Sequence, residues 1–82
     1  PFNPATFIPY RVKERSYVKV MVYDIKGELI KTVVNEMKEA GYYEAEFYGS
    51  GLASGIYLYR IEVIGEGNMP VCMEMKKMIL LK

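Results

Sequence analysis

The side chains that could perform catalysis are few in this chain of 82 residues. It contains no histidine, a single cysteine, Cys72, and a single aspartate, Asp24. Without histidine, the usual general base and every Ser/His/Asp or Cys/His arrangement are missing. Glu44 and Glu46 would lie on one face of a strand and could approach a cation together, but a solvated face is the ordinary role of such a pair. We therefore expect a protein that is not an enzyme and that uses no cofactor and no metal.

Composition and charge exclude several classes of partner. Eleven basic and ten acidic residues give a net charge of +1, whereas a nucleic-acid or anionic-membrane surface would need a clustered basic excess. No apolar run approaches the ~18 residues of a membrane helix. Cys72 alone cannot form an internal disulfide, and we expect it to be buried as a small hydrophobe. The length predicts one small domain over residues 1–82. The start at Pro1, without a signal peptide, suggests a piece of a larger precursor.

The end of the chain is an apolar segment between two lysines. Terminal residues are usually disordered unless something ties them down. A run of four large apolar side chains at this position therefore predicts a strand docked in a sheet, a segment that a partner buries, or both. We take the last six residues as a candidate recognition strand: Lys77, Met78, Ile79, Leu80, Leu81 and Lys82.

The elements that would position this segment are short alternating strands, with no helical period. We expect strands over residues 6–12, 17–24, 28–34, 42–48, 56–64 and 71–82. We expect residues 35–41 to form a charged loop, which could include one helical turn. Pro9 cannot donate a ladder hydrogen bond, so the first strand should lie at an edge or carry a bulge. Six or seven strands at this spacing predict an all-β, antiparallel β-sandwich.

One turn has a recognisable structural pattern. Immunoglobulin-like sandwiches often hold a tyrosine at the start of a strand, with its hydroxyl bonded to the backbone of the preceding loop. Tyr57 fits this position, with Leu52 anchoring the corner in the core and Gly55 permitting the bend. A ligand-binding role for Tyr57 is the alternative. A sugar-binding strip of tyrosines is a further alternative, for which the better exposed candidates would be Tyr17, Tyr23, Tyr42 and Tyr48.

Methionines are concentrated before and within the last strand. Methionine fills irregular gaps in cores and also occurs on adaptable binding surfaces. We expect core filling, with a partner's footprint as the alternative, for Met69, Met73, Met75 and Met78. Beyond Lys76 and Lys77 the apolar character extends to both strand faces, which requires a bulge, a twist or a second layer.

Five motifs occur in an order that resembles a known family: Pro1-Phe2-Asn3-Pro4-Ala5-Thr6, Val20-x-Val22-Tyr23-Asp24-Ile25-x-Gly27, Ala40-Gly41-Tyr42, Gly49-Ser50-Gly51-Leu52-Ala53-Ser54-Gly55-x-Tyr57-x-Tyr59-Arg60 and Lys77-Met78-Ile79-Leu80-Leu81-Lys82. The chain resembles the type A C-terminal sorting domain of the type IX (Por) secretion system. It is also similar to the immunoglobulin-like domain of the flagellar hook-capping protein. The resemblance covers essentially the whole chain, although the segment over residues 69–76 is longer and richer in methionine than is usual.

The resemblance implies an immunoglobulin-like antiparallel β-sandwich of about seven strands, which is not itself catalytic. Such domains lie at the C-terminus of secreted enzymes, adhesins and surface proteins. The outer-membrane translocon reads them, and a sortase-like cysteine peptidase commonly removes them and attaches the cargo to a surface lipopolysaccharide. The implied partners are secretion machinery proteins and an N-terminal cargo domain, with no nucleic acid and no direct membrane span. The implied location is secreted or at the cell surface.

Two other functions stay open at this point. The first is an extracellular structural or adhesive subunit, in which copies of the chain self-assemble into filaments by strand exchange or head-to-tail β contacts. The second is a flagellar hook-cap-type interaction domain.

Overall fold

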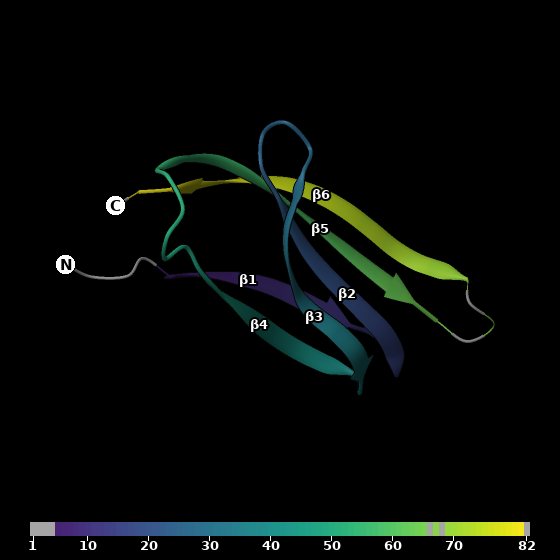
Figure 1. Ribbon diagram of the computed structural model, residues 1–82. Helices are drawn as coiled ribbons and strands as arrows, with labels where there is room; N and C mark the ends of the chain where they lie inside the picture. Colours follow the sequence, from purple (N-terminus) through teal and green to yellow (C-terminus); the bar gives the residue numbers. More distant parts are fainter. Residues whose placement is uncertain (1–4, 66, 68, 82) are drawn as a thin grey trace.

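The computed structural model describes residues 5–65, 67 and 69–81, without the side chains of Val71 and Cys72. These residues form six strands (Figure 1), namely β1 (Ala5–Val12), β2 (Ser16–Tyr23), β3 (Leu29–Lys38), β4 (Gly41–Tyr48), β5 (Gly55–Ile64) and β6 (Pro70–Leu80). Each of these strands overlaps one of the segments expected from the alternating pattern.

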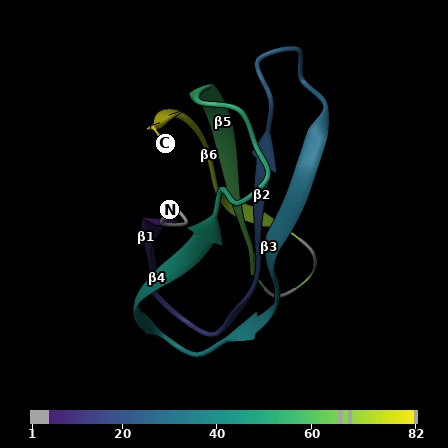
Figure 2. The ribbon, with the colours of Figure 1, turned by 60° about the vertical axis from the view of Figure 1, so that its left-hand side comes forward.

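The strands form two sheets of unequal size. One sheet has two strands, β1 and β4, and the other has four, in the order β3-β2-β5-β6. All neighbours are antiparallel. Figure 2 shows β1 and β4 on one side of the core and β2 and β5 on the other. The fold is therefore the all-β antiparallel sandwich that the sequence predicts.

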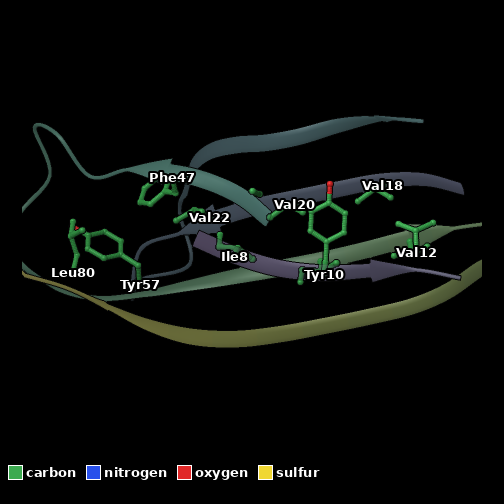
Figure 3. Close-up of a cluster of buried hydrophobic side chains, with 12 residues drawn as sticks. Ile8, Tyr10, Val12, Val18, Val20, Val22, Phe47, Tyr57 and Leu80 are labelled. Atoms are coloured by element: carbon green, nitrogen blue, oxygen red, sulfur yellow. The ribbon is translucent and has the colours of Figure 1, made fainter. Parts of the chain in front are cut away.

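The core lies between the two layers because one face of each strand carries the apolar residues. Successive side chains of a strand point to opposite faces, and β2 shows this most clearly, with Val18, Val20 and Val22 fully buried. Figure 3 shows the inward side chains meeting from both sheets. The buried apolar residues are Ile8, Tyr10, Val12, Val18, Val20, Val22, Ala45, Phe47, Tyr57, Ile61, Val63 and Leu80.

Two expectations about the strands need correction. The described residues contain six strands, not about seven, because the smaller layer consists of β1 and β4 alone. The predicted charged loop over residues 35–41 is also wrong for most of its length. Asn35 and Met37 continue β3, since they pair with Lys19 and Tyr17 of β2, and the Tyr17 hydroxyl donates a hydrogen bond to Asn35 Oδ1 at 2.6 Å. Cross-strand pairing prevails here over the weak local preference of a charged segment.

The first strand lies at an edge, as Pro9 predicts. Among the described strands β1 pairs only with β4, and Pro9 is exposed opposite Glu44. A proline at an edge blocks further strand pairing because it has no N–H to donate.

Candidate recognition strand and its anchoring corner

The candidate recognition strand is the last part of β6, which is an edge of the larger sheet. β6 pairs with β5 on one side, and no strand of the described chain pairs with its other side. The opposite edge of this sheet, β3, is irregular, with register shifts along its pairing with β2. The pairing of β6 is regular from Cys72 to Leu80. Of the two edges of the larger sheet, the free edge of β6 therefore has the longer uninterrupted row of unpaired backbone N–H and C=O groups.

The side chains at the end of β6 alternate between the core and the solvent. Leu80 is 3% exposed, whereas its neighbour Ile79 is 65% exposed. Met78 is half-buried and packs against the core, and Lys77 is exposed. The strand ends at Leu80, so that Leu81 lies beyond it and is 72% exposed. Lys82, the last residue of the predicted recognition strand, lies outside the described residues.

Leu80 is held in place by the corner between β4 and β5. A Cβ atom at Gly49 would lie 2.5 Å from Leu80 Cδ1, so the leucine occupies space that only glycine leaves free at this position. Leu80 and Tyr57 lie together at one end of the core (Figure 3), and Leu80 pairs with Gly55 across the sheet. The terminal strand is thus packed onto the corner as well as bonded to β5.

Internal hydrogen bonds fix the shape of this corner. The Tyr57 hydroxyl donates to the carbonyl of Ala53 at 2.7 Å, which is the type of hydrogen bond predicted from the sequence. The backbone N–H of Leu52 donates to the carbonyl of Gly49 at 3.0 Å, and the Leu52 side chain is partly buried against the core. The sequence did not predict that Leu80 packs against Gly49, because nothing in the sequence distinguishes this glycine from the others of the same turn.

Three described apolar side chains on the outer face of β6 are exposed to solvent. Met73, Met75 and Ile79 are 52%, 55% and 65% exposed, and Ile56 lies beside Ile79 on β5. The prediction that the methionines fill the core is therefore wrong for Met69, Met73 and Met75, and right in part for Met78. Beyond Lys76 and Lys77 there is neither a bulge nor a second layer, so this face is left uncovered among the described residues. The prediction for Cys72 cannot be compared, because its side chain lies outside the described set.

The inner face of β6 is covered only near its end. Glu74 and Lys76 point toward the side of the smaller sheet, yet their side chains are 47% and 57% exposed and their charged groups lie 3.5 Å apart. A hollow of about 300 Å³ opens here, lined by Tyr10, Ile61, Val63 and Glu74 among others. The smaller layer has two strands among the described residues, and the exposure of Glu74 and Lys76 shows that it leaves this part of β6 uncovered.

Perturbed ionisable groups lie away from the recognition strand. Burial, and then the nearby Tyr43 and Glu36, raise the pKa of Tyr10 above its ordinary value. The hydrogen bond to Glu46 raises the pKa of Tyr48, and the two side-chain oxygens are 2.6 Å apart. Glu44 and Glu46 are solvent-exposed. Within residues 5–65, 67 and 69–81, no group of three or more metal-ligating side chains comes together.

The tyrosines differ in exposure from what the sugar-binding alternative requires. Tyr42 and Tyr48 are exposed, as expected, whereas Tyr17 and Tyr23 are half-buried. Tyr43 stacks on Tyr10 with ring centroids 5.3 Å apart. The exposed aromatic rings are therefore fewer than the sequence suggested.

Comparison with known proteins identifies a family to which the chain is similar. No curated protein and no solved structure is significantly similar to the chain. No helix in the described part of the chain is long and apolar enough to cross a membrane. The model of the secretion system C-terminal sorting domain family matches residues 1–69, which include β1 to β5 and end one residue before β6. Because this match covers most of the chain, the chain belongs to the C-terminal sorting domain family of the type IX secretion system.

Proposed function

We propose that this chain is a non-catalytic sorting module, folded as one domain over residues 1–82, whose terminal strand is the element that the secretion machinery recognises. Its family membership supports a C-terminal secretion sorting role for an exported protein. The finer parts of the proposal are recognition through β6 and delivery of an N-terminal cargo domain to the cell surface.

The observation that carries the proposal is the free edge of β6. The pairing of this strand with β5 is regular from Cys72 to Leu80, and no described strand pairs with its other edge. An exposed sheet edge can accept a strand of another protein, with backbone hydrogen bonds supplying affinity and alternate side chains supplying selectivity. Ile79 and Leu81 are exposed and available for selection, whereas Leu80 is committed to the core.

This division of roles permits a test that separates folding from recognition. A secreted reporter protein would carry residues 1–82 at its C-terminus, in cells with an active type IX secretion system. One truncation would end at Leu80 and a second at Ile79. Removing Leu81 and Lys82 leaves the buried Leu80 in place, so we expect a folded domain whose reporter stays in the periplasm. Removing Leu80 as well should also weaken the fold, because a buried leucine is lost.

The control is an exposed position outside the strand. Changing Ile25→Ser in the β2–β3 turn alters a side chain that is 69% exposed, and we expect normal export of the reporter. The fraction of reporter in periplasm, surface and medium would be measured, with protease resistance of the sorting module as the folding check. Surface delivery of the reporter that ends at Leu80, at the level of the full chain, would contradict recognition through the terminal residues.

A further inference from the structure

We propose that the free edge of β6 pairs with the same edge of a second copy of this chain, in one register centred on Met75. The pairing would be antiparallel, with a two-fold axis that is perpendicular to the sheet and passes midway between the two Met75 residues. It would join two four-stranded sheets into one continuous sheet. This inference does not depend on the proposed sorting role, because it concerns the purified chain alone.

The charged side chains on the inner face of β6 form a partly exposed salt bridge with each other, Lys76 Nζ to Glu74 Oε1 at 3.5 Å, and have no ionic partner across the sheet on β5. Glu74 and Lys76 lie opposite Ile61 and Tyr59 of β5, neither of which has a carboxylate, ammonium or guanidinium group. Both charged side chains remain about half exposed. A cross-strand partner of opposite charge can therefore come only from beyond the free edge of β6.

One register places an opposite charge across the edge from both Glu74 and Lys76. In a two-fold antiparallel pair, residues that face each other have sequence numbers that add to a constant, and they point to the same face. With Met75 facing Met75 of the second copy, Glu74 faces Lys76 of that copy and Lys76 faces its Glu74. On the outer face, Met73 faces Lys77 of the second copy.

The neighbouring registers are disfavoured by like charges. A pair centred on Lys76 brings two Lys76 side chains together, and one centred on Lys77 brings two Lys77 side chains together. A pair centred on Glu74 brings two carboxylates together. Like charges directly opposite each other destabilise a strand pair. The adjacent lysines thus act against edge pairing in general. Among the registers centred on residues 73 to 77, the one centred on Met75 is the register in which Glu74 and Lys76 face opposite charges.

The free edge of β6 is also accessible to a second copy. Glu74 and Lys76 are not covered by the β1–β4 layer, so the smaller sheet does not block an approaching strand. Met75 is 55% exposed on the outer face and would gain the Met75 of the second copy as an apolar neighbour. A single strand pair is smaller than the ~1,200 Å² of a standard stable interface. The dimer should therefore be weak, and it closes on itself without forming a filament.

The test is the oligomeric state of designed charge variants. Sedimentation equilibrium of the full 82-residue chain, from micromolar to millimolar concentration, should show a monomer–dimer equilibrium. In the dimer, Lys76→Glu places two pairs of carboxylates opposite each other, and Glu74→Lys places two pairs of lysines opposite each other. Each variant alone should therefore dimerise about tenfold more weakly than the original chain, or more weakly still. An equimolar mixture of the two variants restores opposite charges at both positions and should form a heterodimer. Lys26→Glu, in the exposed β2–β3 turn, is the matched control and should dimerise like the original chain.

A cross-linking experiment tests the register separately. Residues directly opposite in an antiparallel pair have Cα atoms about 4.5–5.5 Å apart, which suits a disulfide. In a Cys72→Ala background, Met75→Cys should form a disulfide-linked dimer under mild oxidation, and Ile79→Cys should not. A chain that is monomeric at all concentrations would overturn the proposal. So would a dimer that is insensitive to both charge variants, or one that cross-links through position 79 and not through position 75.

Discussion

At residue 57, one hydroxyl group connects the core to the backbone of the corner. Tyr57 is 8% exposed, and its hydroxyl donates to the Ala53 carbonyl at 2.7 Å. Tyr57→Phe keeps the ring and removes this hydrogen bond. We expect the free energy of unfolding to fall by about 1 kcal/mol, as measured by urea denaturation. Tyr42→Phe, at an 80% exposed ring, is the control, and an equal loss in both variants would show that the corner bond has no special role.

At residue 49, a missing side chain makes room for the terminal strand. Gly49 is buried, and an added Cβ would meet the terminal methyl groups of Leu80 at 2.5 and 2.6 Å. Gly49→Ala should therefore destabilise the protein by about 1–3 kcal/mol, as overpacking does. The same change made together with Leu80→Ala should cost less, because the space has been vacated. Strictly additive losses in this double-mutant cycle would contradict direct packing of Leu80 on Gly49.

At the scale of one strand, neighbouring side chains at the end of β6 alternate between the core and the solvent, so they should contribute unequally to stability. Leu80→Ala removes a buried side chain, and the expected loss is about 2–5 kcal/mol, a large share of the stability of a small domain. Ile79→Ala changes a side chain that is 65% exposed, and the expected effect is within about 0.5 kcal/mol. Thermal and urea unfolding of the two variants would measure the difference. Equal destabilisation by both would show that the alternation along β6 does not hold in solution.

The strands themselves could be predicted well from the sequence, and their limits less well. Period-two alternation places Val18, Val20 and Val22 on one face without further information, and the structure buries all three. The end of β3 was missed because Asn35 and Met37 have little strand preference of their own. They are held in the strand by pairing with Lys19 and Tyr17, residues that lie far away in the sequence. Such non-local partners determine strand ends more than local propensity does.

At the scale of the whole molecule, the missing information was how the two layers cover each other. The sequence shows which strand faces are apolar, but not that the smaller sheet has two strands and the larger one four. This inequality explains why Glu74 and Lys76 point inward without being buried. Met73 and Met75 are exposed because they point to the outer face of the larger sheet. The corner pattern around Tyr57 could be predicted because it is a local motif. The packing of Leu80 against Gly49 could not be predicted, because this contact joins segments that are distant in the chain.

The burial of Tyr10 between the two layers should also make the stability of the whole fold sensitive to alkaline pH. Burial, Tyr43 and Glu36 raise the pKa of Tyr10 above the value of about 10 that it has in an unfolded chain. The unfolded state therefore loses this proton first as the pH rises. The contribution of Tyr10 is fully present below about pH 10 and is lost as the pH rises toward its pKa in the folded state.

Tyr10→Phe tests this dependence, because it removes the titrating group and keeps the ring that stacks on Tyr43. We expect the variant to match the original chain near neutral pH and to lose less stability between pH values of about 9 and 11. Urea unfolding at a series of pH values would measure both curves. The exposed Tyr42→Phe variant supplies the comparison for tyrosine ionisation in general. Parallel curves for Tyr10→Phe and the original chain would mean that Tyr10 ionises equally easily in both states, and that its buried position between the layers does not govern the alkaline limit of the fold.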